Sequence, residues 1–150
     1  MTRRLITRLD PAGRSCVVSD EPIPALLPAV HLAWATATVP ADAAAPPVAA
    51  SGPNLMDLIH AGGTTFLLVR TPPGAVTPIH ATNSIDYITV LSGEITVVTE
   101  TGDAVLRAGD LMVQGGVLHG WRNDGAVEAV YSVVTVPAHP VAGGRIDPAP

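Results

Sequence analysis

The sequence has little cysteine, little aromatic character and little positive charge, and each shortage excludes a class of protein. Cys16 is the single cysteine among 150 residues, so no disulfide can form within the chain. Aromatic side chains make up only 3%, so the core must be built mainly from Val, Leu, Ile and Ala. Eight Lys and Arg against thirteen Asp and Glu give a net charge of −5 without a basic patch, which argues against nucleic acid as a partner.

Long uninterrupted apolar runs are missing too. The most apolar stretch, residues 23–50, contains five prolines together with His31 and Asp42, so it cannot span a membrane as a helix. The first ten residues carry charge without an apolar segment behind them, unlike a secretory signal. We therefore expect a cytoplasmic protein with no membrane partner.

Glycine and proline are abundant, at fourteen and fifteen residues, and they separate short apolar runs. From residue 63 onward, runs such as TTFLLVRT (64–71) and EITVVTE (94–100) alternate with turn signals. The spacing of about 6–12 residues between turns is typical of an all-β sandwich or barrel. We predict a barrel over residues 63–136, preceded by an extension over 1–62 and followed by a flexible tail over 137–150.

The extension has its own strand-like runs, and the sequence predicts strands at 3–9, 14–19 and 29–39. A Pro/Ala-rich stretch over 40–54 reads as a mobile linker. One helical turn is expected from Leu55 to His60.

Two segments of the predicted barrel carry candidate ligands. If the chain is extended after His80, the two-residue period of a strand places His80, Thr82 and Asp86 on one face. The same rule places His119 and Trp121 together. If these segments are adjacent strands, His80, Asp86 and His119 converge inside the barrel. Two imidazoles and one carboxylate form a facial set for Fe, Mn or Zn that leaves positions open for substrate.

The first of these segments resembles the first motif of the cupin superfamily, in particular the small single-domain bacterial cupins. That motif runs Gly, five residues, His-x-His, three or four residues, Glu, six residues, Gly. Gly74 and His80 have this spacing, Thr82 replaces the second histidine, Asp86 replaces the glutamate, and Gly93 closes the motif.

The second segment resembles the second cupin motif, in which a proline, a glycine, a histidine and an asparagine follow an opening glycine. Gly109 opens it, and Gly116, His119 and Asn123 match the later positions. Gln114 stands near the proline position, one residue short of the usual spacing. The two motifs together cover about residues 63–136.

The resemblance implies an all-β fold, a cupin jelly-roll barrel with a strand-bearing N-terminal extension. It also implies a divalent metal, Zn, Fe or Mn, held by His80, Asp86 and His119. Asp86 is one methylene shorter than glutamate, so either it binds the metal or it orients His80 by a hydrogen bond. Asp86, Thr82 and Trp121 are the candidate catalytic residues, whereas Asn123 is expected to stabilise a turn.

Two functions stay open at this point. The first is a metal-dependent enzyme on a small organic molecule, for which the Val-rich lining suits an aromatic or polyketide-like substrate. Its reaction would be Lewis-acid chemistry, such as dehydration, cyclisation, isomerisation or decarboxylation, or oxygen chemistry. The alternative is a metal-free small-molecule-binding barrel without catalysis, which Thr82 and Asp86 favour. A sugar-phosphate isomerase is a weaker third option because Lys and Arg are scarce near the motifs.

The strands of the extension also predict assembly. Strand edges that stay unpaired invite pairing with another chain, and a two-fold dimer is the commonest closed assembly. Similar small cupins form dimers in which N-terminal strands extend the partner's sheet. We therefore expect a homodimer whose interface uses residues 3–39 and the outer face of one barrel sheet.

Overall fold

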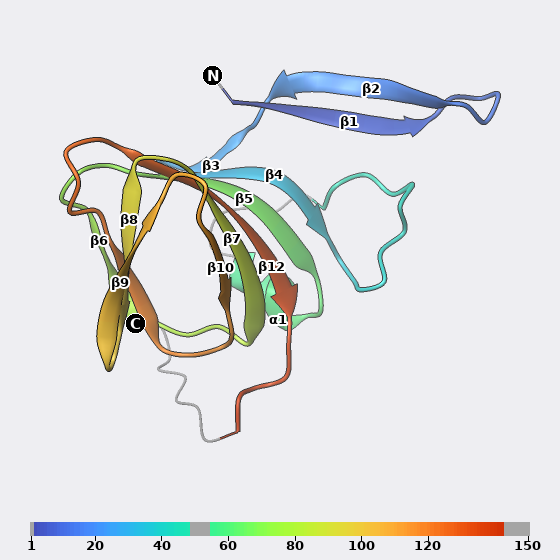
Figure 1. The fold of residues 1–150 in the computed structure, drawn as a ribbon. Coiled ribbons are helices and arrows are strands. Elements are labelled where there is room, and N and C mark those ends of the chain that lie inside the picture. The colour runs from blue at the N-terminus through green and yellow to red at the C-terminus, as the bar shows by residue number, and fades with distance from the viewer. Residues whose placement is uncertain (1, 49–54, 143–150) are drawn as a thin grey trace.

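The computed structural model of this chain describes residues 2–48 and 55–142. Within these ranges the chain forms short strands and one six-residue helix (Figure 1). The elements are β1 (Arg3–Leu9), β2 (Ser15–Pro22), β3 (Ala25–Leu27), β4 (Val30–Thr36), α1 (Leu55–His60), β5 (Thr64–Thr71), β6 (Val76–His80), β7 (Ser84–Ser92), β8 (Glu94–Thr99), β9 (Gly102–Arg107), β10 (Leu111–Gln114), β11 (His119–Arg122) and β12 (Ala129–Pro137).

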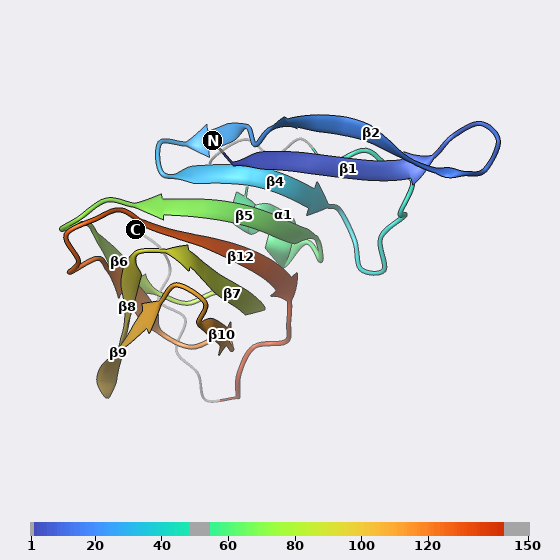
Figure 2. The same cartoon turned by 45° about the horizontal axis from the view of Figure 1, so that its top comes forward.

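Two antiparallel sheets build the barrel. The larger has the strand order β10-β7-β12-β5-β4-β3, and the smaller has the order β6-β11-β8-β9. The β1–β2 hairpin forms a third sheet of its own and lies beside β4, outside the barrel (Figure 2). The all-β jelly-roll fold predicted from the sequence is confirmed.

The core lies between the two sheets, where alternate residues of each strand point inward. Ile88 and Val90 come from β7, and Ile95 and Val97 come from β8. β-Branched side chains such as these pack well on a pleated surface. Gly93 joins the two strands with φ +71°, and a Cβ there would lie 2.6 Å from the carbonyl oxygen of Glu128. The turn therefore needs a glycine for both its conformation and its close packing.

The extension is only partly separate from the barrel. Strands predicted at 3–9, 14–19 and 29–39 and the helix at 55–60 are confirmed, with small changes of bounds. β4 pairs along β5, so the larger sheet continues across the expected boundary at residue 63. The amide of Val48 donates to the carbonyl oxygen of Ala35 at 3.0 Å, so part of the expected linker packs against β4.

Some predictions lie outside the described residues: the linker from 49 to 54 and the tail from 143 onward. The described ranges contain no helix that is long and apolar enough to cross a membrane.

Candidate active site

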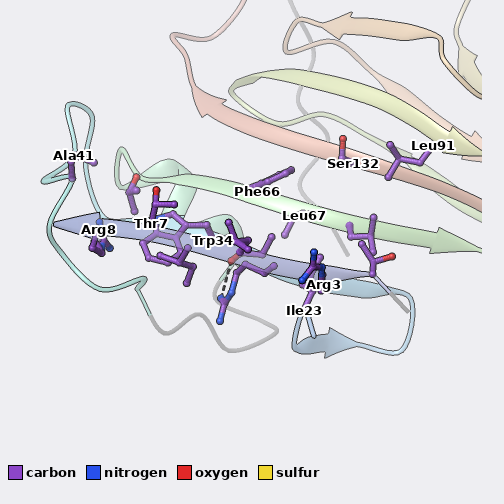
Figure 3. Close-up of a pocket in the computed structure, with 18 of the residues that line it drawn as sticks. Arg3, Thr7, Arg8, Ile23, Trp34, Ala41, Phe66, Leu67, Leu91 and Ser132 are labelled. Carbon is purple, nitrogen blue, oxygen red and sulfur yellow. Dashed lines mark hydrogen bonds between the residues drawn. The ribbon is translucent and has the colours of Figure 1, made fainter. Parts of the chain in front are cut away.

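One hollow in the described part of the chain lies outside the barrel, between the β1–β2 hairpin and the larger sheet (Figure 3). We call it the outer groove; it has a volume of about 550 Å³ and is lined by Arg4, Arg8, Trp34, Phe66, Leu67 and Leu91, among others. Its charged groups are already engaged. Arg4 donates to the carbonyl oxygen of Ala33 at 2.9 Å and pairs with Glu21, and the Arg8 guanidinium lies 5.3 Å from the centre of the Trp34 ring.

A smaller hollow, the barrel pocket, lies between the two sheets and has a volume of about 180 Å³. All five site residues predicted from the sequence line it: His80, Thr82, Asp86, His119 and Trp121. Leu55 and Ile59 of α1 also line this pocket. The outer groove has no histidine among its lining residues, whereas the barrel pocket gathers two.

The two histidines meet because their strands are neighbours. His80 ends β6 and stands opposite His119 in the β6–β11 ladder. Directly opposite side chains of an antiparallel pair project to the same face. The two imidazole rings are accordingly 4.4 Å apart between centroids, with an interplanar angle of 55°.

Asp86 reaches the same pocket from the other sheet, and here one premise of the sequence analysis is wrong. The chain does not stay extended from His80 to Asp86. It leaves β6, makes a tight turn in which the amide of Ser84 donates to the carbonyl oxygen of Thr82 at 2.8 Å, and enters β7. His80 and Asp86 therefore approach one another from opposite walls of the barrel.

Both histidines have a fixed proton on Nδ1. Nδ1 of His80 lies 2.9 Å from the carbonyl oxygen of Pro78, and Nδ1 of His119 lies 2.9 Å from that of Val117. A carbonyl oxygen only accepts, so each Nδ1 donates and each Nε2 carries a lone pair. Metal-binding histidines commonly have this second-nitrogen hydrogen bond to a backbone carbonyl.

Gln114 packs against His119 at the end of β10. Its amide nitrogen lies 3.0 Å from Nδ1 and 2.9 Å from Nε2 of the ring. An atom equally close to both nitrogens must sit over the ring face, because in the ring plane it would collide with the carbon between them. The lone pair of Nε2, which lies in the ring plane, therefore stays accessible. From the sequence alone, Gln114 stands out only as a replacement for proline.

Burial favours the neutral forms of Asp86 and His119. Desolvation raises the pKa of Asp86, opposed by hydrogen bonds from Ser84 at 2.9 Å and from Thr135 and by the nearby His80. Desolvation also lowers the pKa of His119, opposed by the carbonyl of Val117 and reinforced by His80. Neutral imidazole is the form that binds a metal or accepts a proton.

The imidazole nitrogens and the carboxylate oxygens are of the types that bind a divalent cation, but they do not converge on one point in this structure. Within residues 2–48 and 55–142, no three His, Cys, Asp or Glu side chains are grouped so that they could hold one ion. Each histidine has an Nε2 lone pair that can bind a metal. Asp86 Oδ1 accepts from Ser84 at 2.9 Å, and an ionised carboxylate keeps further lone pairs that can bind a cation.

Aromatic rings close the apolar side of the pocket. Trp121 meets His119 edge-on, with centroids 5.9 Å apart, and stacks on Tyr131 at 5.6 Å. Tyr131 was not singled out from the sequence, although Tyr131, Val133 and Thr135 share strand parity and all line the pocket. Applying the two-residue period to β12 finds them.

Asn123 has the structural role expected of it. It is fully buried, and its amide donates to the carbonyl oxygens of Thr71 at 2.7 Å and Val127 at 2.9 Å. Its side-chain oxygen accepts from the amide of Gly125 at 2.9 Å. These bonds tie the turn after β11 to β5 rather than serving the pocket.

Comparisons with known proteins agree on the barrel. The family model described as Cupin domain matches residues 67–136. "Phomopsin biosynthesis cluster protein D" of Diaporthe leptostromiformis is 36% identical over 133 residues, covering 80% of this chain and 69% of that protein. "Cupin-domain-containing oxidoreductase virC" of Hypocrea virens is 32% identical over 66 residues, covering 43% of this chain and 34% of that protein.

Among solved structures, an uncharacterized conserved protein with a double-stranded beta-helix domain from Klebsiella pneumoniae is 25% identical. The superposition has a TM-score of 0.47 and covers 51% of this chain and 69% of that one.

Proposed function

The chain belongs to the cupin family, and from this premise we propose that its barrel pocket is the active site of a metal-dependent enzyme acting on a small organic molecule. One observation carries the proposal. Two imidazoles, His80 and His119, lie 4.4 Å apart between ring centroids in a pocket between the sheets, each with Nδ1 held by a carbonyl and a lone pair on Nε2. A carboxylate, Asp86, lines the same pocket.

His80 and His119 would hold a divalent cation through Nε2, with Asp86 as a candidate oxygen ligand. When bound, such a cation supplies Lewis-acid polarisation of a substrate oxygen or, as iron, oxygen chemistry. The remaining tasks belong to the chain. Trp121 and Tyr131 offer an apolar wall for an unsaturated or ring-bearing part of the substrate.

Asp86 is the group best placed to move a proton in this pocket. Burial raises its pKa, which brings a carboxyl group closer to the range where it can both give and take a proton. Ser84 donates to one of its oxygens and fixes its orientation. Thr82, which is 8% exposed and lines the pocket, is placed to bond a water or a substrate oxygen.

The pocket limits the size of what it takes. A volume of about 180 Å³ suits a small molecule, or one ring and its substituents. The names of the relatives support an enzyme of small-molecule metabolism, since one is a biosynthesis cluster protein and another an oxidoreductase.

The second candidate, a metal-free binding barrel, is favoured by one observation. In the described part of the chain, no three candidate ligands are already grouped for an ion. In this case His80, Asp86 and Thr82 would serve only as hydrogen-bonding groups for a polar ligand.

Calorimetric titration of chelator-treated protein with Zn²⁺, Mn²⁺ and anaerobic Fe²⁺ separates the two functions. The enzyme proposal expects one cation per chain for wild type and loss of binding in His80→Ala and His119→Ala. His31→Ala is the matched control, because His31 is a partly buried histidine of β4 that does not line the barrel pocket. Wild-type protein that binds none of these cations supports the metal-free barrel instead.

We also propose a homodimer, with the outer groove and the β1–β2 hairpin at its interface. The hairpin's ladder pairs only β1 with β2 in the described chain, and a two-stranded sheet alone is marginally stable. It exposes Leu5, Leu9 and Val17.

A further inference from the structure

A third hollow in the described part of the chain lies next to the barrel pocket. We call it the side hollow; it has a volume of about 290 Å³ and is lined by Ile59, His60, Asn83, Pro137, Ala138 and Pro140. Among the described residues, Ile59 is the only one that lines both the side hollow and the barrel pocket. Its side chain is only 2% exposed, so it lies between the two spaces rather than on the surface.

The side hollow lies at the end of the barrel where His80 is. β7 and β12 are antiparallel, and Ser84 at the start of β7 stands opposite Pro137 at the end of β12. The amide of Ala138 donates to the carbonyl oxygen of Asn83 at 3.0 Å, so the loops that follow β6 and β12 meet there. His80 ends β6 just before the first of these loops. The side hollow therefore borders the histidine end of the barrel pocket.

The helix that carries Ile59 is held at its C-terminal end. α1 is followed by Gly62, whose φ of +97° lies in the left-handed region that favours glycine. The amide of Gly63 donates to the carbonyl oxygen of Leu58 at 2.9 Å, and a Cβ on Gly63 would collide with the carbonyl oxygen of Thr36. This close packing ties the end of the helix to β4 and keeps the backbone of Ile59 beside the pocket.

We propose that the side hollow is the entrance to the barrel pocket and that Ile59 is the gate that limits the size of the molecule that enters. The inference rests on the proposed function, in which the barrel pocket takes a small organic molecule. Rotation of the Ile59 side chain between staggered rotamers opens and closes the passage. None of the described residues that line the side hollow is Lys, Arg, Asp or Glu. An ion would lose hydration there without gaining a partner of opposite charge, so the entrance favours an uncharged molecule.

Access of a fluorescence quencher to Trp121 tests the gate, because Trp121 lines the barrel pocket. Trp34→Phe removes the other tryptophan of the chain, so that all tryptophan fluorescence comes from Trp121. Quenching of this full-length parent is measured with two uncharged molecules, acrylamide and the bulkier succinimide. Ile59→Ala should raise the quenching constants about twofold or more, because a quencher reaches a closed pocket only during brief openings. The gain should be larger for succinimide.

Ile59→Phe should change the quenching in the opposite direction. The larger ring fills the passage and has the side hollow to occupy, so both quenching constants should fall. A helix that merely loosens would raise quenching in both Ile59 variants. Opposite signs for Ile59→Ala and Ile59→Phe therefore identify a gate rather than a loss of packing.

Ile95→Ala is the matched control, since Ile95 is a fully buried isoleucine in the same core cluster as Trp121 that lines neither the barrel pocket nor the side hollow. It should raise quenching less than Ile59→Ala does. Equal effects of Ile59→Ala and Ile95→Ala, or a rise in both Ile59 variants, would overturn the proposal. If Ile59→Ala does not fold, an Ile59→Phe protein quenched as readily as the parent overturns it as well. Quenching needs neither a bound cation nor turnover, so a failed gate leaves the metal-dependent function standing, and a failed cation titration leaves the gate standing.

Discussion

The barrel pocket and the outer groove are both hollow, but they are lined in opposite ways. The groove is about three times larger, at about 550 Å³ against about 180 Å³, and its walls are mainly aliphatic and aromatic side chains. Its arginines are engaged by carbonyls, a carboxylate or an aromatic ring. The pocket holds two histidines and a carboxyl group, with burial shifting the pKa of His119 and of Asp86.

The outer groove offers a large apolar volume, whereas the barrel pocket offers reactive side chains. Covering a large apolar hollow on the outside of a sheet with another apolar surface is favourable, so such a hollow suits a partner protein. Folding a small pocket with convergent polar groups costs free energy, because those groups are desolvated. Such a pocket is therefore a candidate site for a ligand. The comparison predicts that equal substitutions in the two hollows have unequal effects.

The largest expected difference concerns the two tryptophans. Trp121→Ala should destabilise the protein by about 3–5 kcal/mol, because Trp121 is 8% exposed and packs on Tyr131 in the core. Trp34→Ala, in the outer groove, should cost about 1 kcal/mol, since Trp34 is only partly buried in the single chain. Urea unfolding of both variants, at a protein concentration low enough for the chain to be monomeric, measures the two free energies. Equal losses would mean that the groove is part of the core.

The next prediction concerns what covers the groove. Phe66 is 45% exposed and stands opposite Trp34 in the β4–β5 ladder, so Phe66→Asp puts a charge into the proposed interface. Sedimentation equilibrium should show a wild-type dimer whose dissociation constant rises at least tenfold in the variant, or about 1.4 kcal/mol. Val105→Asp is the control, because Val105 is 44% exposed on β9, away from the groove. A monomeric wild type contradicts the interface.

The sequence predicted which residues line the barrel pocket better than it predicted how the chain runs between them. β5 was predicted with its observed bounds, because TTFLLVRT is bounded by glycine and proline. Strand parity grouped His80 with Asp86, and the grouping holds, although the chain turns between them and they lie on different sheets. Parity describes a single strand, and it has no information about where a chain crosses from one sheet to another.

Gln114 and the outer groove show what a single sequence does not reveal. Gln114 ends a four-residue strand, and only the pairing of that strand with β7 puts it opposite Asp86. The groove depends on how the β1–β2 hairpin lies against the larger sheet. Neither arrangement leaves a periodic signal within one segment, because both are set by contacts between segments far apart in the chain.

The smallest expected effect is a pH dependence that belongs to the pocket alone. Burial raises the pKa of Asp86 above its ordinary value of 3.8, so the folded protein holds this proton more tightly than the unfolded chain. The resulting stabilisation is complete below pH 3.8 and is lost as the pH rises through the folded-state pKa. Asp86→Asn, which cannot ionise, escapes that loss. His119 has the opposite sign, because its pKa is lowered from 6.5, so its contribution is present above pH 6.5 and is lost as the pH falls.

Urea unfolding of chelator-treated protein isolates the Asp86 effect, because His119 is common to wild type and variant. Asp86→Asn should be more stable than wild type by about 1 kcal/mol at about pH 7, with the gain shrinking toward zero near pH 4. Asp42→Asn is the counterpart in the outer groove, where the carboxylate is exposed and neutralising it releases no buried charge. A gain at Asp42 as large as that at Asp86, or a gain at Asp86 that does not shrink on acidification, would remove the electrostatic distinction between the two hollows. The barrel pocket would then differ from the groove in shape alone.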